Sequence, residues 1–511
     1  MNFIRRYTPG LLLFFLFAVL SVFTFKDYGV SWDEPVTREM GYVYYDYVFN
    51  GDHKLPTYVD RDHGSGFELF LILFEQPFHY ADTKGIYQMR HLVTHLFFLF
   101  SAFCGYLLFL KLSRKQMVAC VGFLLFVLQP RLYAHSFFNS KDIPFTSMFM
   151  ISIALSYMAF TTQKAKWYLL LGAACGFTCS IRMPGILLPV VLAAVIGIDI
   201  VIALLNRKSI IHPTLLFAFF ITSFCATFIL FWPTLWGSPV HNFAECYGMM
   251  SHFVRWQGDI LFNGILYKGT NLPWIYVPEW FCISTPIIWL LAGFAGTALT
   301  LTVFIRKPVI GIQNNQTRFY LICIALFLLP VVMVIFLNSV VYDDWRHLYF
   351  ISAPFAVLGV HAIDRLLAYR TKLLTITLCG LQIVLVACFM IGNHPFQSVY
   401  LNEFVSRKKD HIKNNLEMDY WAVSQKQGLA YIVAHDSAPV IRVAFHPALD
   451  NSIMLLNEQD RKRIVRVSTN ENPDYFVATY RNTHPDDHEY HNISMEINVL
   501  NSTIMRIYKL H

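Results

Sequence analysis

Residues 10–25 read GLLLFFLFAVLSVFTF, and the ten residues that follow them, 26–35, read KDYGVSWDEP. The first run has no charged side chain, and its length is close to what the hydrocarbon core of a bilayer requires. Lys26, Asp27 and Tyr28 stand where a signal peptide would carry small residues for cleavage. We therefore expect a retained membrane anchor.

Composition extends this expectation to the whole chain. Of its 511 residues, 56% are hydrophobic and only 14% are charged, whereas charged residues make up about 25% of an ordinary soluble domain. A soluble protein could not cover so much apolar surface, and a disordered chain, a coiled coil or a disulfide scaffold would have a different composition. The sequence therefore predicts an α-helical polytopic membrane protein.

Eleven apolar runs are candidate membrane spans. They lie near residues 10–25, 90–110, 116–130, 144–161, 168–181, 184–205, 213–232, 281–305, 319–337, 349–367 and 373–392. The third and the fifth are short, which indicates spans that are thin or partly re-entrant.

The charges favour one orientation of these spans. With the N-terminus inside, the inner segments carry fifteen Lys or Arg residues and a single acid, Asp364. The positive-inside rule then places the N-terminus in the cytoplasm and the C-terminus outside. This distribution also accounts for the net charge of +7 without a nucleic-acid partner.

Two regions follow from this layout. Residues 1–392 form a transmembrane module with extracytoplasmic loops at 26–89, 131–144, 233–280 and 338–347. Residues 393–511 have the charge density of a soluble domain, and short β-branched runs alternate there with helical patterns. We expect a small extracytoplasmic α/β domain.

The first polar motif is the pair Asp33 and Glu34, next to Trp32 and just outside the first span. A carboxylate close to a membrane is partly desolvated, which raises its pKa and makes it a better general base. A solvated turn or a helix N-cap explains the pair equally well.

The second motif packs several polar side chains into the short segment 131–144. The candidates there are Arg131, His135, Asn139, Lys141 and Asp142. Asn139 or Asp142 could instead cap the helix that begins near Pro144, and both roles are compatible.

The third motif is Asp344, Arg346 and His347 in the loop before the tenth span. An arginine at the lipid–water boundary can bind a phosphate through two parallel hydrogen bonds. Alternatively, Arg346 reaches to lipid headgroups or pairs with Asp344.

Two further positions complete the set. Asp62 and His63 begin a glycine-containing run, and the glycines indicate a tight turn or a close backbone approach. A metal site there would lack known further ligands. Arg182, between two closely spaced spans, is either a lipid-phosphate contact or a helix-end anchor.

One arrangement accommodates all of these groups. Loops from several spans would converge at the outer face on a substrate with a tail in the bilayer and a phosphorylated head. A carboxylate would deprotonate an acceptor hydroxyl, which would attack an anomeric carbon. Cations would neutralise the lipid phosphate that leaves.

The Asp33–Glu34 loop after the first span, the acidic second loop at Lys141–Asp142 and the N-inside layout resemble the GT-C superfamily. Its members are membrane glycosyltransferases fed by polyprenyl-phosphate sugars. The resemblance is to the branch of protein O-mannosyltransferases and lipid A aminoarabinose transferases, and it covers residues 1–392. The runs at 63–68, 139–144 and 344–349 resemble a bacterial subgroup.

The resemblance implies that Asp33 is the catalytic base, with Glu34 beside it, and that Asp142 positions the acceptor or the base. It implies that Arg346, Arg182 and Lys141 bind the donor phosphate. The remaining polar candidates would position substrates: Trp32, His63, Arg131, His135, Asn139, Asp344 and His347. Two features depart from the family: the mannosyltransferases' lectin-like insertion is missing, and the C-terminal domain is outside the known pattern.

The function expected is therefore an inverting glycosyltransferase that moves a monosaccharide from a polyprenyl-phosphate donor to a lipid, glycan or protein acceptor. A lipid-linked glycan polymerase or ligase is the first alternative. A transporter or flippase is the second, but it would place ionisable groups near the bilayer midplane, where Asp199 is almost the only acid.

No cofactor is expected. The acid pairs at 33–34 and 343–344 could hold Mg²⁺ or Mn²⁺, which we regard as the less favoured alternative. The partners expected are the lipid-linked donor, the acceptor and membrane lipids, and the expected location is a bacterial inner membrane with the C-terminus in the periplasm.

Overall fold

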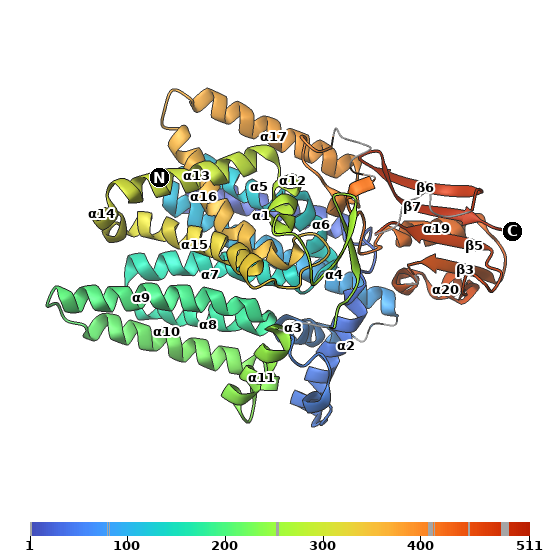
Figure 1. Cartoon of the computed structure of the whole chain (residues 1–511), viewed down its shortest axis with the longest axis horizontal. Helices are drawn as coiled ribbons and strands as arrows, with labels where there is room; N and C mark the ends of the chain where they lie inside the picture. The colour runs from blue at the N-terminus through green and yellow to red at the C-terminus, as the bar shows by residue number, and fades with distance from the viewer. Residues whose placement is uncertain are drawn as a thin grey trace.

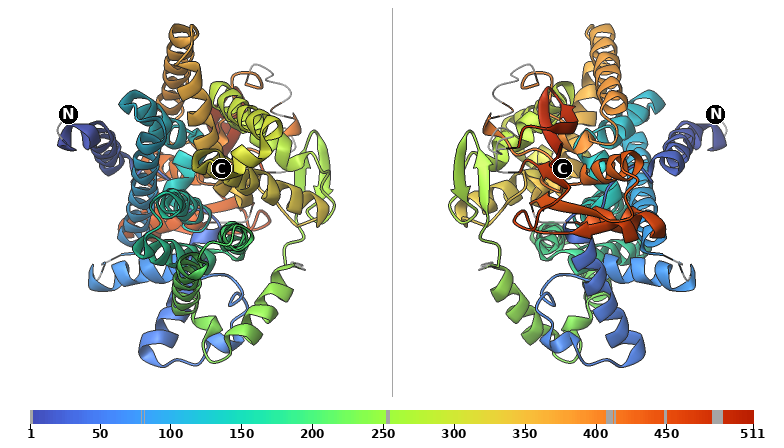
Figure 2. Two further views of the ribbon diagram at one scale, coloured as in Figure 1. Left: turned by 90° about the vertical axis from the view of Figure 1, so that its left-hand side faces the viewer. Right: turned by 90° about the vertical axis from the view of Figure 1, so that its right-hand side faces the viewer.

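The computed structural model describes residues 3–78, 80, 82–251, 255–406, 412, 414–447, 450–481 and 490–511. A bundle of long helices fills one part of the molecule, and a small sheet lies at one end of the bundle (Figure 1). Figure 2 shows both ends of the bundle, with the C-terminal elements in front of the helices in its right-hand view.

Nine helices among the described residues are long and apolar enough to cross a membrane. They span Arg6–Thr24, Thr83–Ser113, Asp142–Thr162, Met183–Leu205, Ile211–Leu230, Ile287–Arg306, Asn315–Phe336, Arg346–Leu366 and Lys372–Gly392. Each coincides with a predicted span. Helices close all their backbone hydrogen bonds internally, which lipid requires, and the protein is an integral membrane protein.

The two short predicted spans have a different form. The third consists of α5 (Gln116–Val127) and α6 (Pro130–Phe138), which meet at an angle of 61°. The fifth is the 17-residue helix α8 (Ala165–Ile181). Counting the bent pair as one span gives up to ten full spans, and α8 corresponds to the eleventh predicted.

The segment near 131–144 is a correction to the prediction of a loop. Every residue of α6 is buried, because its apolar side chains, such as Leu132 and Phe137, pack into the main core. A segment that contains polar residues can still form a buried helix when its apolar residues recur at helical spacing, and α6 is such a helix.

The other elements have the following bounds. Helices α1 to α4 are Phe3–Thr24, Asp33–Tyr45, Gly66–Glu75 and Thr83–Ser113; α7 is Asp142–Thr162; α9 to α17 are Leu187–Leu205, Ile211–Leu230, Pro239–Ser251, Tyr276–Ser284, Ile287–Arg306, Pro308–Gln313, Asn315–Phe336, Ser352–Leu366 and Lys372–Gly392; α19 and α20 are Gln425–His435 and Glu458–Arg463.

The strands form two sheets. A hairpin joins β1 (Asp259–Phe262) to β2 (Ile265–Lys268). The C-terminal sheet has the order β4-β3-β5-β7-β6, with parallel pairs on one side of β5 and antiparallel pairs on the other. Its strands are β3 (Ile441–His446), β4 (Ile464–Arg466), β5 (Tyr475–Thr479), β6 (Ile493–Val499) and β7 (Ser502–Lys509). Leu429 and Ile432 of α19 pack on this sheet, so the predicted α/β character of the C-terminal region is confirmed.

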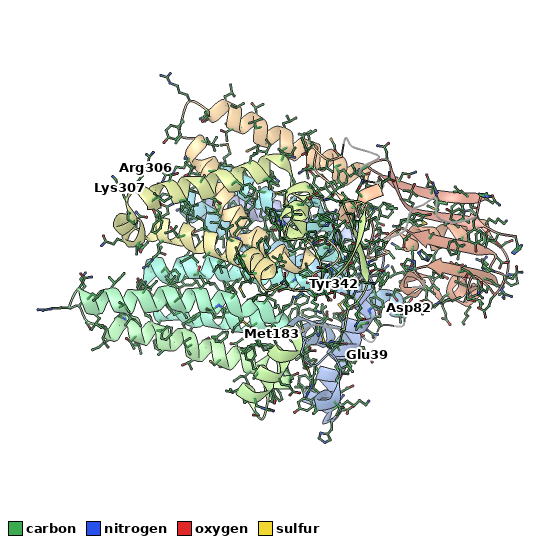
Figure 3. The ribbon with its side chains drawn as sticks, viewed as in Figure 1. Glu39, Asp82, Met183, Arg306, Lys307 and Tyr342 are labelled. Atoms are coloured by element: carbon green, nitrogen blue, oxygen red, sulfur yellow. The ribbon has the colours of Figure 1, made fainter. Side chains whose placement is uncertain are left out.

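The two ends of the bundle differ in charge. Arg306 and Lys307 lie at the end away from the sheet, whereas Glu39, Asp82 and Tyr342 lie in the half nearer to it (Figure 3). At the basic end, Lys115 Nζ lies 2.9 Å from Asp364 Oδ1, which joins the start of α5 to the end of α16.

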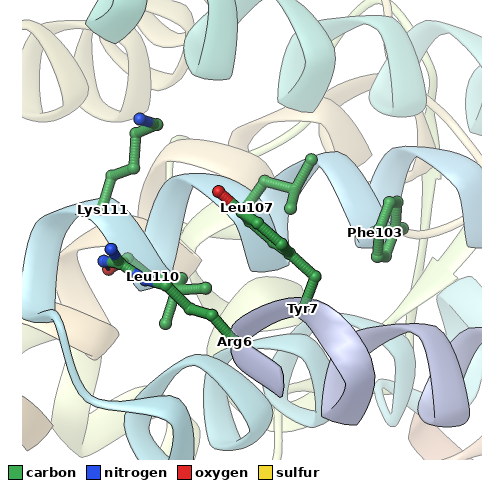
Figure 4. A pocket seen from close by; sticks show the side chains of 6 residues that line it. All are labelled: Arg6, Tyr7, Phe103, Leu107, Leu110 and Lys111. Carbon is green, nitrogen blue, oxygen red and sulfur yellow. Dashed lines mark hydrogen bonds between the residues drawn. The ribbon is translucent and has the colours of Figure 1, made fainter. Parts of the chain in front are cut away.

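A pocket of about 350 Å³ lies between α1 and α4 at this same basic end (Figure 4). It is lined by Arg6, Tyr7, Phe103, Leu107, Leu110 and Lys111. With no carboxylate in its lining, this pocket offers no general base.

Candidate active site

Four segments meet at the end of the bundle nearer the sheet. Asp33 begins α2, Lys141 and Asp142 begin α7, Arg182 follows α8, and Arg346 begins the short helix Arg346–Ile351 that leads into α16. Each charged group therefore lies at the first or last turn of a helix.

Arg346 is the centre of this cluster. Its Nη1 lies 3.6 Å from Asp33 Oδ2 and 3.2 Å from Asp142 Oδ2, and its Nη2 lies 3.2 Å from Asp343 Oδ2. The guanidinium also lies over the ring of Trp421, at 4.7 Å from the ring centroid. The side chain is 4% exposed, so three carboxylates and an aromatic ring hold it in place.

Asp142 is buried between two arginines, because Arg182 also forms an ion pair with it. Asn139 contributes in two ways. Its Nδ2 donates to Asp142 Oδ2 at 2.9 Å, and its Oδ1 accepts from the backbone N–H of Asp142 at 2.8 Å. Asn139 therefore orders the first turn of α7 and also orients the carboxylate that the two arginines share.

Lys141 is the third cation. Burial, and then the charges of Arg182 and Arg346, lower its pKa to about 7, while Asp33 opposes the change. No carboxylate of a described residue lies within ion-pair distance of its Nζ. The site therefore contains one cation that is not already neutralised by a partner.

Asp33 differs from the other carboxylates in its exposure. Its side chain is 44% exposed, against 1% for Asp142 and 9% for Asp343. Asp33 is thus the carboxylate of this cluster that an incoming molecule can reach, and the guanidinium of Arg346 lies beside it.

Glu34 points elsewhere. It accepts hydrogen bonds from Ser31 N at 2.7 Å and Ser31 Oγ at 3.1 Å, and its other oxygen lies 2.8 Å from His91 Nε2. The side chain is buried. Glu34 therefore attaches the turn that precedes α2 to His91 of α4. Asp33, its neighbour in the chain, stays exposed.

Arg131, His135 and Asp344 form a separate buried group. Arg131 Nη1 lies 2.6 Å from Asp344 Oδ2, which also accepts hydrogen bonds from the hydroxyls of Tyr349 and Tyr420. Burial raises the pKa of Asp344, although Arg131 opposes the rise. The contacts of Asp344 with Arg131, Tyr349 and Tyr420 hold in place the loop that also carries Asp343 and Arg346.

His63 and His347 lie at the edge of the cluster. Burial and the charge of Lys141 lower the pKa of His63 to about 4. The ring of His347 meets the ring of Tyr342 edge-on at 4.6 Å, and its buried Nδ1 has no hydrogen-bond partner within the described part of the chain.

Asp60, Asp62 and His63 form a group that could hold a metal ion, with ligand atoms within 4.8 Å of one another. Arg255 already pairs with both carboxylates. Burial alone would raise the pKa of Asp62, but hydrogen bonds from His63 and Arg255 outweigh it and hold the pKa at about 2. The arginine supplies the positive charge that an ion would otherwise provide.

Glycines near His63 permit the close approach that the sequence predicts. A Cβ on Gly64 would lie 2.2 Å from the backbone oxygen of Ser180, and one on Gly66 would lie 2.2 Å from Ser180 Oγ. The start of α3 therefore packs directly against the end of α8, two residues before Arg182.

Several structural residues were not singled out from the sequence. Glu68 is buried, forms an ion pair with Arg90 and accepts a hydrogen bond from Ser140. This links α3 and α4 to the residue before Lys141. A glutamate and an arginine 22 positions apart carry no local signal of this contact.

Arg481, at the end of β5, was also not foreseen. It forms an ion pair with Asp343, lies 3.9 Å from Glu417 and sits over the rings of Trp32 and Trp256, at 5.2 and 5.6 Å. Burial raises the pKa of Glu417 well above its usual range, and Arg481 opposes the rise. Through Asp343, the C-terminal sheet is joined to Arg346.

The arrangement combines an exposed carboxylate with three cations beside it, at the end of a membrane bundle. Such a set can accept a proton from a hydroxyl and can stabilise negative charge on a phosphate at the same place.

Part of the chain is similar to a known protein family. Residues 68–238, about a third of the chain, match the family model described as dolichyl-phosphate-mannose-protein mannosyltransferase. This segment contains Lys141, Asp142 and Arg182, while Asp33 and Arg346 lie outside it. No curated protein sequence matches the chain.

Two solved structures are similar in outline. One is ArnT from Cupriavidus metallidurans bound to undecaprenyl phosphate, with 13% identity, 98% of each chain covered and a TM-score of 0.49. The other is the Archaeoglobus fulgidus oligosaccharyltransferase in its apo form, with 11% identity, 81% of this chain and 57% of that chain covered, and a TM-score of 0.42. Likenesses of this size carry no argument about the site.

Over about a third of its length the chain is therefore similar to a family of protein mannosyltransferases. The predicted resemblance to protein O-mannosyltransferases is confirmed for that segment.

Proposed function

We propose that this protein is an inverting glycosyltransferase that uses a polyprenyl-phosphate monosaccharide and glycosylates a lipid, glycan or protein acceptor at the outer face of the membrane. One observation carries the proposal. The guanidinium of Arg346 contacts the exposed Asp33 and the buried Asp142, with Arg182 on the other oxygen of Asp142.

The donor phosphate would bind to Lys141, Arg182 and Arg346. Lys141 has no carboxylate partner among the described residues, and two arginines depress its pKa. A phosphate placed there would supply the missing negative charge and restore the lysine's ordinary affinity for a proton. Charge-assisted hydrogen bonds of this kind are about twice as strong as neutral ones.

The chemical step would be a single displacement. Asp33 would accept the proton of the acceptor hydroxyl while that oxygen forms its bond to the anomeric carbon. The bond from that carbon to the phosphate oxygen would break at the same time, and its electron pair would leave with the lipid phosphate. One displacement inverts the configuration, and the cations neutralise the charge on the leaving oxygen without a proton donor.

The orientation is part of the proposal. The lysines and arginines of the inner segments would lie in the cytoplasm, and the site and the C-terminal domain would lie outside, in the periplasm of a bacterial inner membrane. The matching family is described by a dolichyl-phosphate-linked donor, which supports a lipid monophosphate here. The donor's tail would then lie in the bilayer beside the bundle.

The proposal includes no resident metal. Glu34 is occupied by Ser31 and His91, and Asp343 and Asp344 are occupied by arginines. Three of the four carboxylates in the two acid pairs of the sequence therefore face protein donors, which is unlike an oxygen-rich Mg²⁺ site.

Transfer from a set of radiolabelled polyprenyl-phosphate sugars in membranes would test the proposal. Asp33→Asn should reduce transfer at least about a hundredfold, with Glu39→Gln, an exposed carboxylate on the same helix, as the matched control. Transfer that survives in Asp33→Asn and is lost in Glu34→Gln would move the base to Glu34. Wild-type enzyme that uses no monophosphate donor would favour the polymerase or ligase, and then the transporter or flippase.

A further inference from the structure

A second pocket of about 280 Å³ is lined in part by Trp32, the residue before Asp33, and none of Lys141, Arg182 and Arg346 lines it. Its lining comes from three distant parts of the chain: Trp32 before α2, Trp256 and Asp259 of the 233–280 segment, and His446, Thr479 and Arg481 of the C-terminal sheet. A pocket that draws on all three parts exists only in the assembled protein.

The pocket is connected to the proposed base through specific contacts. Trp32 immediately precedes Asp33 in the chain. On the other side, Arg481 pairs with Asp343, Asp343 lies 3.2 Å from Arg346, and Arg346 lies 3.6 Å from Asp33. Two lining residues therefore lead to the proposed base: Trp32 by its place in the chain, and Arg481 through Asp343 and Arg346.

The aromatic wall is held rigidly. The ring of Trp256 stacks on Tyr342 with 4.2 Å between centroids and an interplanar angle of 7°. Gly258 and Gly269 flank the ring so closely that a Cβ would lie 2.6 and 2.3 Å from it. The guanidinium of Arg481 lies over the rings of Trp32 and Trp256. A preformed wall of this kind lowers the entropic cost of binding.

The charges around the pocket are paired. Arg481 is neutralised by Asp343, and Asp259 Oδ1 lies 2.6 Å from Lys268 Nζ. Burial lowers the pKa of His446, so its imidazole adds no net charge at pH 7. The pocket therefore fits a ligand without net charge that carries hydroxyl groups.

A sugar ring has these properties, because its flat C–H face packs on an aromatic ring while its hydroxyls bond at the rim. The volume, just below the range of about 300–1,000 Å³ for small-molecule sites, suits one ring and excludes a lipid tail. We propose that this pocket binds a neutral saccharide unit of the acceptor and presents its hydroxyl to Asp33. The inference rests on the proposed function and assigns it a glycan acceptor.

Saturation-transfer NMR on the full chain in phospholipid nanodiscs would test this, because it detects the weak binding expected of single sugars. The probes are neutral methyl hexopyranosides, with glucuronate, inorganic phosphate and a serine/threonine peptide as competitors. Wild type should bind at least one methyl glycoside, and none of the three competitors should displace it.

Trp256→Ala should weaken this binding about tenfold, and Trp256→Phe should restore part of it. Trp274→Ala is the matched control, because Trp274 lies in the same segment, is 66% exposed and lines no part of the pocket. Binding of polyprenyl phosphate, measured on the same samples, should be equal in all variants and reports that each is folded.

The possible failures are distinct. Equal glycoside binding in wild type and Trp256→Ala, no glycoside binding at all, or displacement by the peptide or by glucuronate would each overturn the saccharide pocket. Glycoside binding through Trp256 in a protein that does not bind polyprenyl phosphate would overturn the proposed donor and leave the pocket in place.

Discussion

Arg346 Nη1 lies 3.2 Å from Asp142 Oδ2, although the two residues are 204 positions apart in the chain. The contact joins the start of α7 to the short helix Arg346–Ile351, which leads into α16. Both side chains are almost fully buried, so the loss of either removes one of the few partners that neutralise the other. Arg346 therefore acts as a structural tie as well as a phosphate ligand.

Arg346→Lys should lower kcat/KM for the donor about a hundredfold. A lysine keeps the charge but cannot reach Asp33, Asp142 and Asp343 together, and losing one preorganised donor to a developing charge costs about 10²–10³ in rate. Transfer measured against donor concentration gives the value. Arg318→Lys is the control, because Arg318 pairs with Asp199 near the other end of the bundle.

A fall in activity that merely follows a fall in folded protein would contradict this role. The midpoint of thermal unfolding in detergent should therefore be measured for both variants. Equal midpoints together with unequal kcat/KM would identify Arg346 as a ligand of the substrate.

The pH dependence of donor binding should depend on Lys141. Its pKa is lowered to about 7 by burial, by Arg182 and by Arg346, against Asp33 and Asp60. The lysine is charged below this pKa, so its attraction for phosphate is fully present in acid and is lost as the pH rises through about 7. The donor KM should accordingly increase between pH 6 and 9 and then level off, because the two arginines remain charged.

Two variants separate this effect from other titrations. Lys141→Arg should remove the alkaline rise in KM, since arginine stays charged. Lys141→Met should show the high KM at every pH. A rise that persists unchanged in Lys141→Arg would mean that a group other than Lys141 titrates.

The spans could be predicted because each is a long apolar run with few charges, and lipid allows little except a helix for such a run. Asp33, Asp142 and Arg346 could be singled out because each ends an apolar run in a short polar motif. The direction in which each side chain points could not be predicted from the sequence. Glu34 is adjacent to Asp33 in sequence, yet it turns inward to Ser31 and His91.

The contribution of the C-terminal domain lay beyond sequence reasoning. Arg481 meets Trp256 and Trp32 across more than 200 residues of chain, and nothing local to any of the three indicates the others. For Asp344, the sequence suggested a partner, but the structure shows different ones. Its neighbour Arg346 was the partner considered from the sequence, but Arg131 and two tyrosines bind it.

Gly64→Ala should destabilise the protein by about 1–3 kcal/mol, the usual cost of adding a methyl group where there is no room. The new Cβ would lie 2.2 Å from the backbone oxygen of Ser180, and backbone cannot rotate away as a side chain can. A lower midpoint of thermal unfolding in detergent would show this. Gly197→Ala, with nothing within 4 Å, should have an equal or higher midpoint; equal midpoints for all three proteins would contradict the close packing of α3 on α8.

Removal of divalent metal should leave transfer unchanged within about twofold. The carboxylates nearest Asp33 are already directed at arginines, and Asp60 and Asp62 are paired with Arg255, so an ion would have to displace a cation that is covalently part of the chain. Transfer should be measured after dialysis against EDTA and again after adding Mg²⁺ or Mn²⁺. Activity that is lost on chelation, restored by Mn²⁺ and absent from Asp62→Asn would overturn this and would place an ion at Asp60, Asp62 and His63, because that group alone combines two carboxylates and an imidazole within 4.8 Å among the described residues.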